Sequence, residues 1–209
     1  MISSKHFPNA EDMLESRGGI RVLQCATWSQ VVPHLDTCNA LIVPGGSATQ
    51  QWNEMSKEHM AAVREFVRRG GGYIGFCAGA FLGGASFLKL VEVEHVAKLV
   101  KAGDLKGQVR CAEAAADAGA VVAEVSMNYH NGPVYDWKLP RGVCVVATAV
   151  DVSNDLSKVR SKMRNKPMIV ESTFGAGHVV LCGPHPEHTD GLQEWTWRLI
   201  SRCIRHPRQ

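Results

Sequence analysis

The chain has 209 residues, of which 45% are hydrophobic and 21% are charged, as in an ordinary globular protein. The 23 lysines and arginines barely exceed the 20 aspartates and glutamates, and a net charge of +3 argues against a dedicated nucleic-acid site. The start of the chain lacks a signal-peptide core, and no apolar run reaches transmembrane length. We therefore expect one cytoplasmic domain over residues 1–209, with no nucleic-acid and no membrane partner.

Short apolar runs alternate with helical segments in the first half of the chain. A helix between two buried strands connects them in parallel, so this half indicates an α/β domain. In this fold a first strand would ordinarily precede the series, so either residues 1–7 form a short edge strand or the sheet lacks it. The pattern predicts a helix over 10–17, a strand over 20–26, a short helix over 29–35 broken by Pro33, and a strand over 40–43. It also predicts a helix that Ser56 caps and that ends just before Gly70.

The second half is richer in strands. Periodicity is lost between residues 81 and 109, although 92–101 has the composition of a helix. Strands are predicted over 121–125, 143–149, 168–171 and 179–181, with Gly175-Ala176-Gly177 turning the last two into a hairpin. An amphipathic helix marked by Leu192, Trp195, Leu199 and Cys203 is predicted to close the domain against the sheet.

The segment Gly72-Tyr73-Ile74-Gly75-Phe76-Cys77-Ala78-Gly79-Ala80 has the features of a nucleophile elbow. A strand would deliver Cys77 to a sharp turn into a helix, where small neighbours are required and the helix dipole favours a thiolate. A buried, inert cysteine at the end of a strand is the alternative. The other six cysteines are scattered, which fits reduced cytosolic thiols, and no Cys-x-x-Cys spacing indicates a metal.

A candidate base follows about a hundred residues later, where a buried strand ends in His185-Pro186-Glu187. A thiol nucleophile needs a base, and the base needs a carboxylate to orient it. On an extended chain, His185 and Glu187 would project from one face, and Pro186 favours that geometry. Taken alone, a histidine before proline is an ordinary turn residue. Combined with the elbow, the pattern predicts a Cys77–His185–Glu187 triad.

Three motifs in this order resemble the class I glutamine amidotransferase superfamily: Pro44-Gly45-Gly46 after a strand, the Gly75–Gly79 elbow, and His185-Pro186-Glu187. Residues 70–81, 129–135 and 183–187 are more closely similar to the amidotransferase-like N-terminal domain of eukaryotic-type biotin-protein ligases. The resemblance implies a flavodoxin-like three-layer sandwich with a mainly parallel central sheet and a strand-rich C-terminal half.

Elbow geometry makes the Ala78 amide one donor to an oxyanion. The resemblance implies that Gly46 supplies the second donor with Gly45 beside it, although an ordinary loop is the alternative for this turn. It also implies that Gly79 and Asn131 contact the substrate; Asn131-Gly132 by itself is first a turn signal. His188 is assigned to a solvated turn rather than to a metal, and no cofactor is expected.

Two departures from the family pattern affect the expected function. The Gln or His-Gln that commonly follows the elbow in glutamine-using members is replaced by Ala80-Phe81-Leu82-Gly83, and the biotinyl-adenylate loop of the ligases has no counterpart in these 209 residues. We expect a Cys-His-Glu amide hydrolase or amidotransferase-type activity on a small carboxamide. The main alternative is a non-catalytic regulatory or binding module whose partner is a biotin ligase or carboxylase. A peptidase E-like or hydratase-like enzyme is a third option.

Overall fold

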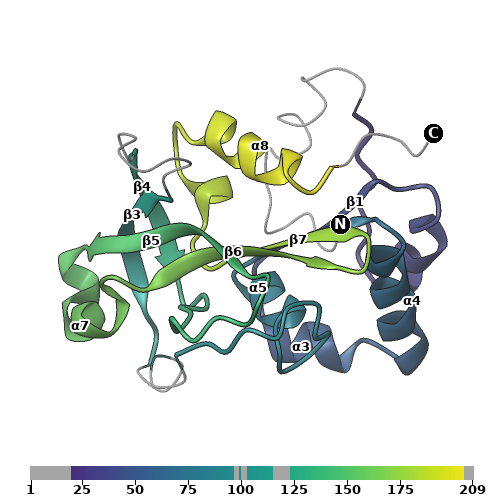
Figure 1. The fold of residues 1–209 in the computed structure, drawn as a ribbon, viewed down its shortest axis with the longest axis horizontal. Coiled ribbons are helices and arrows are strands. Elements are labelled where there is room, and N and C mark those ends of the chain that lie inside the picture. Colours follow the sequence, from purple (N-terminus) through teal and green to yellow (C-terminus); the bar gives the residue numbers. More distant parts are fainter. Residues whose placement is uncertain (1–19, 97–98, 100–102, 115–122, 205–209) are drawn as a thin grey trace.

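The computed structural model describes residues 20–96, 99, 103–114 and 123–204. The helix predicted over 10–17 and the edge strand considered for 1–7 lie outside these residues. Seven strands form one curled sheet in the order β1-β2-β7-β6-β5-β3-β4 (Figure 1). The strands are β1 (Ala40–Val43), β2 (Gly72–Phe76), β3 (Lys106–Glu113), β4 (Glu124–His130), β5 (Cys144–Val152), β6 (Pro167–Phe174) and β7 (Gly177–Cys182).

Helices connect and cover these strands. The longest is α4, which begins after Ser56 because the Ser56 hydroxyl accepts a hydrogen bond from the His59 N–H at 3.2 Å. It ends before Gly70, whose φ of 111° suits glycine. The α-helices are α2 (Trp28–Val31), α3 (Ala48–Asn53), α4 (Lys57–Arg68), α5 (Ala78–Gly83), α7 (Arg160–Met163) and α8 (Gln193–Ser201); the 3₁₀ helices are η2 (Val32–His34), η3 (Asn154–Val159) and η4 (Pro186–His188).

The sheet is mixed, so the prediction of a mainly parallel sheet is wrong. Strands β1, β2 and β7 are mutually parallel, as expected for strands joined by helical crossovers. The pairings of β7 with β6, β6 with β5, β5 with β3 and β3 with β4 are all antiparallel. For β6 and β7 the physical reason is connection length: they are joined by a tight turn at Gly175, where φ is 62°, and a turn this short can only reverse the chain.

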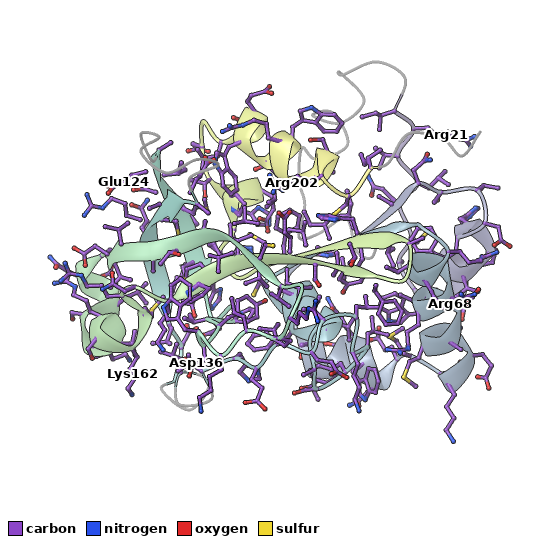
Figure 2. The ribbon with its side chains drawn as sticks, viewed as in Figure 1. Arg21, Arg68, Glu124, Asp136, Lys162 and Arg202 are labelled. Carbon is purple, nitrogen blue, oxygen red and sulfur yellow. The ribbon has the colours of Figure 1, made fainter. Side chains whose placement is uncertain are left out.

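Alternate residues of the parallel strands point into two cores on opposite faces of the sheet. Ile74 and Phe76 of β2 belong to one core with Leu199 of α8, whereas Tyr73 belongs to the other core with Phe66 of α4. Helices therefore cover both faces, with α8 on one side and α3, α4 and α5 on the other (Figure 1). Charged side chains such as those of Arg68 and Lys162 lie at the periphery (Figure 2).

Several predicted elements differ from those observed. Residues 20–24 form no strand and Cys25 makes only an isolated bridge; Ile20 and Val22 pack against the core without pairing. Of the helix predicted over 92–101, residues 92–96 are not helical and His95 pairs with Tyr135 instead, whereas Leu99 is helical. Strand β3 was missed because most of its side chains are only partly buried or exposed, so it carries little apolar signal. The strand predicted from residue 121 is observed over Glu124–His130.

Several other predicted elements agree with the structure. The strand over 40–43, the strand before Cys77, the β6–β7 hairpin and the closing helix are confirmed. A search of the described residues finds no helix with the length and apolarity that crossing a membrane requires.

Candidate active site

Cys77 lies at the junction of β2 and α5 in a backbone conformation that is rare for any residue with a side chain. Its φ is 49° and its ψ is −103°. A Cβ added to Gly75 would lie 2.2 Å from the Gly79 carbonyl oxygen, and one added to Gly79 would lie 2.1 Å from that of Val43. The glycines are therefore required by the closeness of the turn to its neighbours, and the strained conformation is the one that an elbow imposes on its nucleophile.

His185 is held by the edge strand β4 rather than by β7 alone. Its N–H donates to the Asn128 carbonyl at 2.7 Å, and the Thr189 hydroxyl donates to the His185 carbonyl at 2.7 Å. The predicted extended geometry ends at His185, because Pro186 begins the short 3₁₀ helix η4. This turn brings Glu187 back toward the ring, with 2.7 Å between His185 Nδ1 and Glu187 Oε1.

The Glu187 side chain is fully buried and that of His185 is 12% exposed. Burial opposes the imidazolium and lowers the pKa of His185, but hydrogen bonds with Cys77 and Glu187 and their negative charges outweigh burial and raise this pKa to about 10. The Cys77 Sγ also lies 3.2 Å from the His130 carbonyl oxygen, to which the thiol can donate. The structure thus places Cys77 beside the His185 ring, which is hydrogen-bonded to Glu187.

The glycine turn lies directly against this group. A Cβ on Gly45 would come within 2.8 Å of His185 Cε1 and 3.5 Å of the Cys77 Cβ. Gly46, which has a φ of 135°, lines the same cavity as Gly45, Cys77 and Ala78. Gly79 was predicted to contact substrate, but it does not line the cavity. Instead it packs against Val43, and its carbonyl accepts a hydrogen bond from the Tyr73 hydroxyl at 2.8 Å.

Asn131 lines the cavity and also forms a turn, with a φ of 55°. Its side-chain oxygen accepts from the Leu105 N–H at 2.7 Å, and its amide nitrogen donates to Asp104 at 2.8 Å. The His130 Nε2 lies 2.7 Å from the same Asp104 oxygen. The amide thus uses one of its two N–H donors and one of its two acceptor positions to hold the 104–105 segment.

The cavity has a volume of about 1070 Å³ and extends well beyond the three predicted triad residues. One wall is aromatic: the rings of Phe81 and His95 meet edge to face, with 4.9 Å between their centroids. Most of these lining residues were not predicted from the sequence, because strand β3 and the 86–95 segment carry no recognisable motif. The additional lining residues include Phe81, Phe87, His95, Lys106, Gln108, Asn128 and Asp155.

His188 lies closer to the candidate triad than the sequence indicated. The possible ligand atoms of His185, Glu187 and His188 lie within 4.8 Å of one another, so Glu187 offers the third ligand atom that the sequence did not indicate. Two imidazoles and a carboxylate suit zinc. A metal ion bound there would have to displace the 2.7 Å contact between His185 and Glu187. The absence of a metal stays a prediction.

The family model described as "Biotin-protein ligase, N terminal" matches residues 20–100, which include the glycine turn and the elbow but not His185. An uncharacterized protein of Chlamydia muridarum is 28% identical over 166 residues, covering 73% of this chain and 62% of its own length. The chain therefore spans less than two thirds of the length of that curated relative.

Solved structures with a similar fold have low sequence identity. PurLQS from Thermotoga maritima is 16% identical with a TM-score of 0.60, over 93% of this chain and 91% of the other. The cytoplasmic protein STM3548 from Salmonella typhimurium is 12% identical with a TM-score of 0.56, over 93% and 85%. These similarities support the mixed α/β fold. The family match shows that residues 20–100 are similar to the N-terminal part of biotin-protein ligases.

Proposed function

We propose that this protein is a cysteine-dependent amide hydrolase or amidotransferase-type enzyme of the class I glutamine amidotransferase-like group. The observation that carries the proposal is the position of the His185 ring, which is hydrogen-bonded to Glu187 and lies with Cys77 against Gly45. A strained elbow cysteine, a buried imidazole and a carboxylate are the parts that acyl transfer through a thioester requires.

In the proposed reaction, the Cys77 sulfur attacks the amide carbonyl carbon and His185 accepts the thiol proton. Glu187 keeps the His185 ring oriented and stabilises its charge. The tetrahedral intermediate collapses to a thioester as His185 returns the proton to the leaving nitrogen, releasing ammonia from a primary amide. Water, deprotonated by His185, then attacks the thioester and frees the carboxylic acid and the thiol.

The substrate is proposed to be a carboxamide other than free glutamine. The cavity of about 1070 Å³ is slightly larger than the usual range for small-molecule sites, which is about 300–1,000 Å³. Its aromatic wall at Phe81 and His95, together with the lining residue Phe87, suits an apolar group beyond the amide. The residues after the elbow also lack the glutamine-holding pattern.

The test is release of ammonia from a panel of primary carboxamides, with intact-mass detection of an acyl-enzyme. We expect turnover by the wild type and none by Cys77→Ala. The matched control is Cys144→Ala, because Cys144 is an exposed thiol far along the chain in β5. Activity that survives in Cys77→Ala, or thioester formation on Cys144 alone, would contradict the proposal.

A second candidate function is a non-catalytic module acting in biotin-protein ligation. It is favoured by the family match over residues 20–100, which covers the cysteine but not the histidine segment. Under this alternative, the protein binds a biotin ligase or a biotin-accepting carboxylase. Binding of a purified ligase or carboxylase that is unchanged in Cys77→Ala, together with no turnover of any carboxamide, would favour the module over the enzyme.

A further inference from the structure

Gln51 is a buried polar residue behind the glycine turn that the proposed triad does not use. It lies in the middle of α3 and is only 8% exposed. Its N–H donates to the Ser47 carbonyl at 2.9 Å, and its carbonyl accepts from the Trp28 indole N–H at 2.9 Å. The backbone of Gln51 is therefore fixed on both sides.

The side chain of Gln51 reaches the glycine turn. Its Nε2 donates to the carbonyl oxygens of Pro44 and Gly45, in two long hydrogen bonds of 3.4 Å each. The opposite amide orientation would place Oε1 against two acceptors, so the contacts themselves determine which atom is the nitrogen. Within the described residues, Oε1 of Gln51 is buried without a hydrogen-bond partner. An unpaired buried acceptor lowers the stability of the fold, so the amide is kept here at some cost in folding free energy.

Holding these two carbonyls determines where the neighbouring N–H groups point. The Gly45 C=O and the Gly46 N–H belong to one planar trans peptide and point in opposite directions. Anchoring the oxygen at Gln51 therefore directs the Gly46 N–H away from α3. In the described part of the chain, neither Gly45 nor Gly46 donates a backbone hydrogen bond. Both glycines line the cavity that contains Cys77.

We infer that Gln51 is a positioning residue that orients the Gly45–Gly46 peptide so that the Gly46 N–H donates to the oxyanion. Two consecutive glycines have little intrinsic preference for one backbone conformation. A side chain from another element is therefore needed to hold the peptide in the required orientation before the reaction. This inference rests on the proposed function, because the donor matters only if Cys77 forms a tetrahedral intermediate.

The experiment compares two reactions of the same thiol in the full chain. Acylation by 4-nitrophenyl acetate passes through an oxyanion: sulfur bonds to the carbonyl carbon and 4-nitrophenolate leaves. Alkylation by iodoacetamide displaces iodide at a saturated carbon and forms no oxyanion. We expect Gln51→Leu to slow acylation of Cys77 by about tenfold or more, less than the 10²–10³ typical of deleting a donor itself. Alkylation is expected to change less than about twofold, because it does not use that donor.

Gln50→Leu is the matched control, since Gln50 is the exposed neighbour whose amide bonds Glu54 at 3.1 Å; both rates are expected to stay at the wild-type level. Gln51→Met also removes the donor, with an unbranched side chain of similar length, and serves if Gln51→Leu does not fold. Equal slowing of both reactions, or no slowing of acylation, would overturn the role of Gln51. Wild-type protein that is alkylated but acylated no faster than Cys77→Ala would instead overturn the proposed function itself.

Discussion

Gly45 and His185 are in such close contact that the glycine has no room for a side chain: a Cβ would lie 2.8 Å from His185 Cε1. The glycine turn and the histidine segment come from opposite ends of the chain, and this contact holds the ring between Cys77 and Glu187. It links the region matched by the biotin-protein ligase N-terminal family to the part of the site that lies beyond that match.

Gly45→Ala is therefore expected to displace the His185 ring. Overpacking of this kind typically costs about 1–3 kcal/mol of unfolding free energy. We also expect iodoacetamide to alkylate Cys77 more slowly at pH 7, because the displaced His185 ring can no longer accept the proton of the Cys77 thiol. Denaturant unfolding and alkylation rates measure the two effects.

The double variant Gly45→Ala/His185→Ala is the control. Removing the ring makes room for the new methyl group, so Gly45→Ala is expected to cost much less stability in the His185→Ala background. An equal cost in both backgrounds would show that the methyl group clashes with something other than the ring.

Cys77→Gly is expected to give a more stable protein than Cys77→Ala. The φ of 49° and ψ of −103° are unfavourable for any side chain but accessible to glycine. We expect a difference of about 1 kcal/mol or more in unfolding free energy, the order of the strain stored at such positions. A lower stability of Cys77→Gly than of Cys77→Ala would mean that the elbow is not strained.

Glu187→Gln is expected to lower the pKa of His185 from its value of about 10, since burial would then act against the imidazolium with less opposition. A pKa raised in the folded state stabilises the fold fully below the unfolded value of about 6.5 and loses this effect as the pH rises toward 10. The advantage of wild type over Glu187→Gln is therefore expected to be larger at pH 6 than at pH 10. Urea unfolding at both pH values, with NMR titration of the His185 ring, provides the measurement; a pH-independent difference would contradict the prediction.

Glu171→Gln probes a second partly buried group, which joins the sheet to the end of α8. Burial raises the pKa of Glu171, but hydrogen bonds from His178 and Arg202 and the charge of Arg202 lower it to about 2. A pKa lowered in the folded state contributes stability above the unfolded value, and this contribution disappears as the pH falls toward 2. We expect the stability of wild type to approach that of Glu171→Gln between pH 4.5 and pH 2, as followed by acid unfolding. Arg198→Gln, which removes a more exposed α8 cation, is expected to leave this acid transition in place.

The sequence by itself determined the features that depend on neighbouring residues. The Ser56 cap, the Gly175 turn and the small residues around Cys77 act over a few positions, so their sterics and hydrogen bonds can be recognised along the chain. The order of the glycine turn, the elbow and His185-Pro186-Glu187 likewise predicted which side chains meet.

Only the tertiary structure decided the rest. The antiparallel half of the sheet and strand β3 depend on pairing between segments far apart in the chain, and the β3 side chains carry too little apolar signal to reveal it. Gln51 looks like any helical glutamine until the fold places its amide against Pro44 and Gly45, and Gly79 becomes a packing residue only because Val43 lies against it. Burial and long-range contacts, not local preference, assign these residues their roles.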